Sequence, residues 1–212
     1  MILSEQHIFK RGSRAFSEFE RLCRNANNLY NATMYYVRQE FFAGTIVSYG
    51  AVNKKFIQDK QIDYYSLPTK ISQQIQRLVG SAWKSYFVAV KDYKEHPLKY
   101  LGKPQIPRYR EKGGFCVVPF TRQSIAFQTR NIPNGFLRLS GTSVLIKTKR
   151  EEIQAARLVP LDRNHIKVEV LYDVKCPEAR SNGKIASIDL GVNNLATIVY
   201  PNSRTEIING RH

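Results

Sequence analysis

Two long amphipathic stripes in the first half of the chain constrain the fold more than any other feature. Over residues 16–41, apolar side chains recur every three to four positions, and this spacing predicts a helix of about seven turns. A second stripe begins near Pro68, a residue that suits the first turn of a helix, and ends before Pro97. The sequence therefore predicts two long helices, with a shorter one over residues 52–59 between them.

Short β-rich runs surround these helical stripes. Residues 2–11 alternate weakly between apolar and polar side chains and predict a strand at the start of the chain. After Pro97, further apolar runs predict strands over residues 115–118, 124–128, 136–139, 143–148, 158–161 and 165–174. Several short strands at close spacing are typical of a small barrel or sandwich. We therefore expect an α+β protein in which a helical insertion interrupts a small β-barrel that the first strand joins.

A third region follows a linker-like stretch over residues 176–183. Its first apolar run predicts a strand that ends at Asp189, and further strands are predicted over residues 195–200 and 205–208. A carboxylate at the end of a rigid strand suits a magnesium site, because Mg²⁺ takes oxygen ligands in strict geometry. Alternatively, Asp189 caps its own turn. Glu206, the only acid after Asp189, is expected to face solvent.

The charge of the chain is strongly one-sided. Lysine and arginine number 33 against 17 acids, a net charge of +16 that implies a polyanionic partner. Residues 99–150 contain eleven of these cations and a single acid. Within them, cationic side chains flank Tyr109 among prolines and glycines; these are Lys103, Arg108, Arg110 and Lys112. An extended basic segment with an aromatic side chain can follow a phosphate backbone, and the alternative is an ordinary solvated loop.

Several other classes of protein are disfavoured. No apolar run approaches the roughly 20 residues that span a bilayer, and the segment after Met1 does not resemble a signal peptide. The cysteines Cys23, Cys116 and Cys176 are too far apart to form a C-x-x-C zinc element. We therefore expect a cytoplasmic protein with no membrane partner.

One pair of polar residues on the second predicted helix suits base recognition. Lys70 and Gln74 are four positions apart, so both lie on one helix face. A glutamine amide can bond adenine with two hydrogen bonds, and a lysine can reach a base acceptor or a phosphate. The alternative is a polar helix face exposed to solvent.

Four stretches of the sequence together resemble the TnpB family, transposase-like proteins encoded by insertion sequences. The family consists of RNA-guided DNA endonucleases related to type V CRISPR effectors. The run Asp-Leu-Gly-Val-Asn-Asn-Leu-Ala-Thr at residues 189–197 resembles the family's first RuvC motif. Residues 29–34, 67–74 and 102–114 are similar to its first helix, its second helical segment and its basic link, in the same order.

This resemblance implies a division into three parts. Residues 1–12 and 97–176 would form a wedge-type, OB-like β-barrel with the basic link, and residues 13–96 a helical recognition insert. Residues 183–212 would begin an RNase H-like (RuvC) nuclease domain that is incomplete here. Guide RNA and target DNA are the partners that the resemblance implies.

The resemblance also implies roles for individual residues. Asp189 corresponds to the first catalytic carboxylate and would bind Mg²⁺ in a two-metal site. The later Glu and Asp of the family have no counterpart, so this chain alone is not expected to cut DNA. Lys70 and Gln74 correspond to residues that read a target-adjacent DNA motif, and Tyr49 and Thr121 align with others more loosely.

Two alternatives remain open at this point. The chain could instead be a naturally short protein that binds DNA or RNA without cutting, as a repressor or accessory factor. The pattern Asp-Leu-Gly-x-x-Asn also resembles the phosphate loop of the actin, Hsp70 and sugar-kinase ATPases. Those proteins carry the loop near their N-terminus, whereas 188 residues precede it here, and this favours the nuclease.

Overall fold

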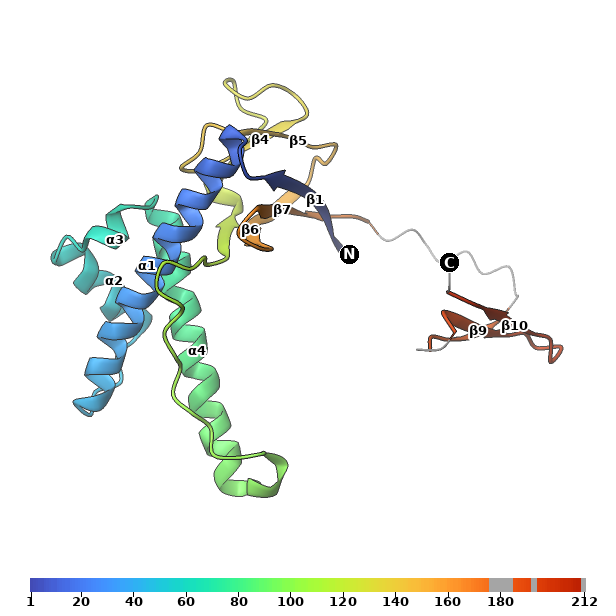
Figure 1. The fold of residues 1–212 in the computed structure, drawn as a ribbon, viewed down its shortest axis with the longest axis horizontal. Helices are drawn as coiled ribbons and strands as arrows, with labels where there is room; N and C mark the ends of the chain where they lie inside the picture. The colour runs from blue at the N-terminus through green and yellow to red at the C-terminus, as the bar shows by residue number, and fades with distance from the viewer. Residues whose placement is uncertain (176–184, 192–193, 211–212) are drawn as a thin grey trace. The chain divides into compact units, whose positions relative to one another are not determined.

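The computed structural model describes residues 1–175, 185–191 and 194–210. The chain divides into two compact units, Met1–Val174 and Lys175–His212 (Figure 1). The predicted linker over residues 176–183 lies outside the described residues.

The helices of the first unit follow the two apolar stripes. They are α1 (Arg14–Phe42), α2 (Tyr49–Gln58), α3 (Ile62–Tyr65) and α4 (Thr69–Glu95). The predictions of two long helices and a short one between them are confirmed. The four-residue α3 was not predicted, because a single turn is too short to show a periodic pattern.

Seven strands complete the first unit. They are β1 (Ile2–Lys10), β2 (Val118–Thr121), β3 (Ile125–Phe127), β4 (Phe136–Leu139), β5 (Leu145–Lys147), β6 (Ile153–Pro160) and β7 (His165–Asp173). They form a four-stranded sheet in the order β1-β7-β6-β2 and a three-stranded sheet in the order β3-β4-β5, and all pairs are antiparallel. The first strand therefore pairs with the last strand of this unit across the helical insertion. The sequence predicted that the first strand joins the others, but not which strand it pairs with. The description of these sheets as a wedge-type barrel stays a prediction.

Most of the predicted strands in this unit lie within two residues of their observed bounds, and two differ by more. The strand predicted over residues 115–118 begins only at Val118, because the Cys116 amide donates to the Cys23 carbonyl of α1 at 3.0 Å. The strand predicted over residues 158–161 begins earlier, at Ile153.

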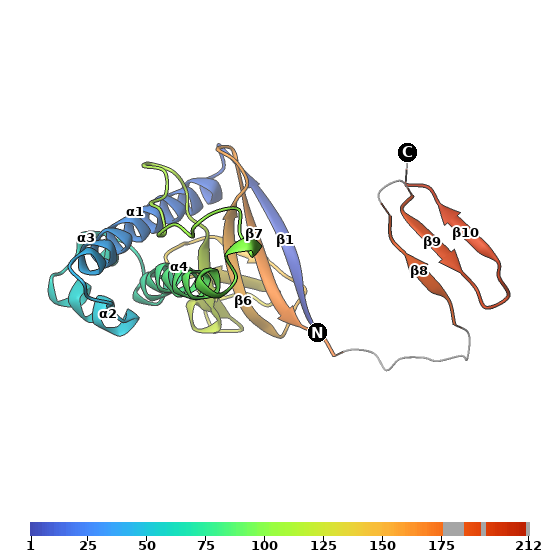
Figure 2. The same cartoon turned by 90° about the horizontal axis from the view of Figure 1, so that it is seen from below.

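The core lies between the long helices and the four-stranded sheet. Figure 2 shows α1 and α4 on one side of the sheet that contains β1, β7 and β6. Fully buried side chains from both layers fill the space between them; they include Phe19, Leu22, Ile71, Ile75, Leu158 and Val168. Each such side chain contributes about 1.5–3 kcal/mol through removal from water.

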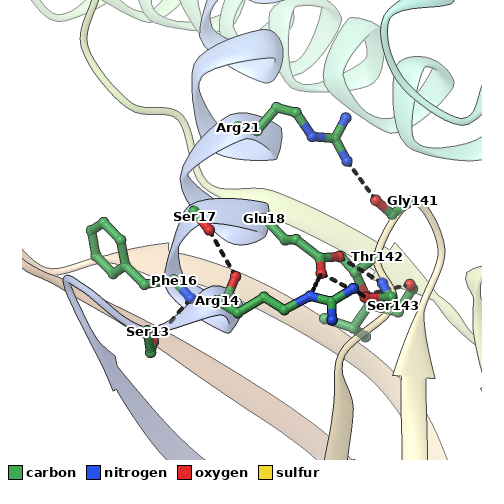
Figure 3. Close-up of polar contacts among 10 residues, drawn as sticks. Ser13, Arg14, Phe16, Ser17, Glu18, Arg21, Gly141, Thr142 and Ser143 are labelled. Atoms are coloured by element: carbon green, nitrogen blue, oxygen red, sulfur yellow. Dashed lines mark hydrogen bonds and ion pairs between the residues drawn. The ribbon is translucent and has the colours of Figure 1, made fainter.

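The turn between β4 and β5 is bound to the starts of both long helices. Gly141 has a φ of +83°, and a Cβ atom there would lie 3.0 Å from the Pro68 side chain. Its carbonyl accepts a hydrogen bond from Arg21 at 2.8 Å, and the amide and hydroxyl of Ser143 both donate to Glu18 at 2.6 Å (Figure 3). Only glycine suits this close approach, since a side chain at this φ would be strained as well as crowded.

The second unit is a small antiparallel sheet. Its strands are β8 (Ser187–Asp189), β9 (Ala196–Val199) and β10 (Thr205–Ile208), in the order β10-β9-β8. The three predicted strands are confirmed, and their assignment to an RNase H-like fold stays a prediction.

Candidate nucleic-acid interface

An extended segment, which we call the basic strap (residues 103–116), is hydrogen-bonded along α1. The strap contains no helix and no strand, and Figure 1 draws it in light green between the end of α4 and β2. Four side chains of α1 donate to its backbone carbonyls: Arg38 to Pro107 at 2.8 Å, Asn31 to Arg110 at 3.1 Å, Asn27 to Glu111 at 2.9 Å and Arg24 to Gly113 at 2.7 Å. The donors are three, four and seven positions apart, which places them along one side of the helix. Side chains of α1 thus hold the strap in place by hydrogen bonds to the backbone of the strap.

This attachment leaves most of the strap's cationic side chains free to meet a partner. Lys103, Arg108 and Lys112 are all exposed. The helix binds carbonyl oxygens, so the hydrogen bonds that order the strap do not use these cations. The extended conformation predicted for this segment is confirmed, and its role in binding phosphates stays a prediction.

Arg110 differs from its neighbours because it packs on the helix. Its guanidinium carbon lies 4.4 Å from the centre of the Tyr30 ring, and its amide donates to the Asn31 side chain at 2.8 Å. Burial raises the pKa of the Tyr30 hydroxyl, and the charge of Arg110 opposes that rise. Arg110 therefore has a structural contact that the sequence did not indicate. The adjacent Tyr109 is 45% exposed and lies under the Arg38 guanidinium at 5.0 Å.

The end of the strap borders a polar cavity of about 510 Å³. Four cationic side chains line it together with three acids; the cations are Arg11, Arg24, Lys112 and Arg163. Arg24 is paired with Glu20 at 2.8 Å, so part of this charge is already neutralised. Arg11 and Arg163 were not predicted as part of this surface, because they are distant in sequence from the strap.

The predicted base-reading residues lie on or beside α4. Lys70 is exposed and Gln74 is half-buried in the first turns of this helix. Tyr49 begins α2, and the guanidinium of Arg77 from α4 lies 4.9 Å from the centre of its ring. Thr121 ends β2, a strand that packs against α4. Arg77 was not predicted, although its position seven residues after Lys70 on the same face is a usable signal.

The predicted metal ligand Asp189 lies at the exposed end of β8. The register pairs Asp189 with Thr197 and pairs Ile198 with both Ile188 and Glu206. Since directly paired residues share a face and successive residues alternate, Asp189 and Glu206 lie on opposite faces of this sheet.

Glu206 is therefore no partner for Asp189. It is 40% exposed, pairs with Arg204 at 2.5 Å and accepts a hydrogen bond from the Tyr200 hydroxyl at 3.1 Å. The expectation that it faces solvent is thus only half right, because a cation and a hydroxyl both contact it.

Within residues 1–175, 185–191 and 194–210, no group of three or more His, Cys, Asp or Glu side chains could bind a metal ion. Asp189 is one suitable ligand, and a two-metal site needs several carboxylates. No cleavage step follows from the described residues. None of the helices in this part of the chain is long and apolar enough to cross a bilayer.

Comparison with known proteins gives a coarse likeness at the level of solved structures. No protein-family profile matches the chain, and no curated protein matches it. Similar solved structures include a chain from a cryo-EM structure of a Cas12f1–sgRNA–target DNA complex, with 14% identity and a TM-score of 0.35. Another is from a CRISPR-Cas12f ternary complex, with 14% identity and a TM-score of 0.37.

The likeness covers 98% and 93% of this chain but 57% and 49% of the two neighbours. The chain thus spans about half the length of these Cas12f chains.

Proposed function

We propose that this chain is the nucleic-acid-binding N-terminal portion of a TnpB-like, RNA-guided DNA endonuclease that binds guide RNA and target DNA. The observation that carries the proposal is the attachment of the basic strap. Side chains of α1 donate hydrogen bonds to the carbonyls of the strap. Lys103, Arg108 and Lys112 therefore remain exposed on an ordered, extended backbone. An ordered row of cations binds phosphates with less loss of conformational entropy than a disordered loop.

In this proposal, two surfaces bind nucleic acid in different ways. The strap binds phosphates irrespective of sequence, and the start of α4 reads bases through Lys70 and Gln74, with Tyr49 and Thr121 nearby. The four sequence motifs that resemble TnpB, and the net charge of +16, support the same assignment.

The proposal gives Asp189 the role of a metal ligand in the complete protein. It would be one carboxylate ligand of Mg²⁺, which when bound activates water and stabilises the leaving oxygen. The remaining carboxylates would come from elsewhere in the complete protein. An origin in an insertion sequence is part of this proposal.

A second candidate is a protein that binds DNA or RNA without cutting. The basic strap and the net charge of +16 would serve such a protein equally well, and in the described residues Glu206 lies on the opposite face from Asp189. A DNA cleavage assay on the complete natural protein separates the two candidates. Magnesium-dependent cleavage that is lost in Asp189→Ala supports the first candidate, and absence of cleavage supports the second.

The strap is tested by the salt dependence of binding to a single-stranded RNA. For the triple variant Lys103, Arg108, Lys112→Ala, we expect the slope of log K against log salt to fall by about 2, because each lost phosphate contact on a single strand contributes about 0.7. The matched control removes three exposed lysines elsewhere, as Lys54, Lys91, Lys94→Ala. Equal effects of the two triple changes would show that the strap is not the phosphate-binding surface.

A further inference from the structure

An apolar cavity of about 610 Å³ lies beside α4, two turns beyond Lys70. Side chains from α1, α2 and α4 line it, together with the segment that connects α1 to α2. Its volume falls within the roughly 300–1,000 Å³ range of sites that enclose small organic ligands.

The wall of this cavity contains buried polar atoms without partners. Gln76 is 2% exposed, Thr33 1% and Trp83 4%, and all three line the cavity. In the part of the chain that the structure describes, both atoms of the Gln76 amide lack a hydrogen-bond partner, as do the Thr33 hydroxyl and the Trp83 indole N–H. Buried polar side chains are usually paired, so a donor and an acceptor left open on one amide point to a ligand.

The rim of the cavity is cationic. Arg77 and Lys84 are exposed and line the same cavity. They lie seven and fourteen residues after Lys70, so the three cations follow one face of α4. The row of cations that begins at Lys70 therefore extends along α4 to the rim of the cavity.

These features together fit one class of ligand. A nucleotide has a flat apolar base, an edge with hydrogen-bond donors and acceptors, and a phosphate. The cavity offers apolar walls with an indole, the donor and acceptor of the Gln76 amide, and cations at its rim. Glutamine pairs with the adjacent donor and acceptor of adenine, and aromatic side chains bind unstacked bases.

We propose that this cavity binds a single unstacked base of the bound nucleic acid, with Gln76 pairing an adenine edge. Arg77 and Lys84 then contact the flanking phosphates. This inference rests on the proposed function, and it adds a base-specific site that is separate from Lys70 and Gln74.

The test uses the fluorescence of Trp83, the single tryptophan of the chain. The probe is an oligothymidylate of about 15 nucleotides with one central adenosine, a length near the upper site size of single-strand binding folds. Its partner probe has an abasic site at the central position. We expect the full chain to bind the adenosine probe at least about tenfold more tightly and to change its Trp83 emission on binding.

The variant Gln76→Leu should abolish this tenfold preference. Its melting temperature should stay the same or rise, because the change removes two buried polar atoms that lack partners. The matched control is Gln39→Leu, at an exposed glutamine of α1, which should keep the preference.

The possible failures are distinguishable. Equal binding of both probes by the unaltered chain would overturn the cavity inference, whatever the change in Trp83 emission, and would leave the proposed function standing. Absence of binding to either probe would overturn both. A change of emission that depends on protein concentration and needs no probe would mark the cavity as a contact between two copies of the chain, and would also refute the base site. The comparison of probes on the unaltered chain decides the matter even if Gln76→Leu does not fold.

Discussion

At the scale of single residues, Glu18 joins two distant parts of the first unit. Its carboxylate accepts hydrogen bonds from both the hydroxyl and the amide of Ser143, each at 2.6 Å (Figure 3). These two bonds, the hydroxyl's first, hold the pKa of Glu18 below its usual value, while burial opposes them. The side chain thus attaches the β4–β5 turn to α1 in its charged form.

This arrangement predicts a pH dependence of stability. A carboxylate whose pKa is lowered on folding stabilises the protein above the unfolded-state value near 4.5, and the contribution disappears as the pH falls through the folded-state pKa. We expect Glu18→Gln to lower the free energy of unfolding by roughly 1–3 kcal/mol at neutral pH, and the difference should shrink below about pH 4.5. Urea denaturation at several pH values measures this difference in the free energy of unfolding. The control is Glu95→Gln, at an exposed glutamate. A difference that is constant down to pH 3 would rule out this role.

Some of these single-residue positions follow from local sequence spacing, and others depend on tertiary contacts. The four-residue spacing was enough to place Lys70 and Gln74 on one face of α4. The sequence around Gly141 does not indicate that this residue lies against Pro68, because the contact forms only when the β4–β5 turn packs against the start of α4. Asn27 and Asn31 were missed as well, although two asparagines four apart inside an apolar stripe are a signal that could have revealed a bound backbone.

At the scale of elements, the strap depends on α1 for its order. Asn31 makes two hydrogen bonds to Arg110, one to its carbonyl and one from its amide. We expect Asn31→Ala to cost about 1–3 kcal/mol of stability, because each bond contributes about 0.5–1.5 kcal/mol. RNA affinity should fall too, since binding then has to order the strap.

Hydrogen exchange at the Arg110 amide measures the loosening directly. The control is Asn28→Ala, at an exposed asparagine of the same helix. Faster exchange in both variants to the same degree would mean that α1 as a whole, rather than Asn31, orders the strap.

Helices were predicted more accurately than strands for a physical reason. The periodicity of α1 and α4 is a local property of the sequence, visible without any tertiary structure. A strand boundary depends on its partner: residues 115–117 read as a strand, yet the Cys116 amide bonds the Cys23 carbonyl of α1 instead.

At the scale of the whole molecule, the two units have unequal shares of the charge. Residues 1–174 contain 28 of the 33 cationic and 14 of the 17 acidic side chains. They also form one of the two compact units. The two ends of this unit are joined by a hydrogen bond from the Val174 amide to the Met1 carbonyl at 2.9 Å.

A chain truncated after Val174 should therefore fold and bind RNA. We expect its melting temperature to stay within a few degrees of the full chain, and the salt slope of binding to be nearly unchanged. Calorimetry and fluorescence anisotropy measure the two quantities. A truncated chain that lacks a cooperative transition would show that the first unit needs residues 175–212 to fold.

The pairing of β1 with β7 has a consequence during synthesis. The register joins residues 2–10 to residues 165–173, so the partner of the first strand is translated last in this unit. At about 5–20 residues per second, β1 leaves the ribosome roughly 8–30 s before β7 exists. The helices between them rely on nearby contacts and form early, while pairing between distant segments is slow. The nascent chain thus carries an unpaired strand edge until residues 165–173 have been synthesised, and the first strand of this unit is among the last to join its sheet.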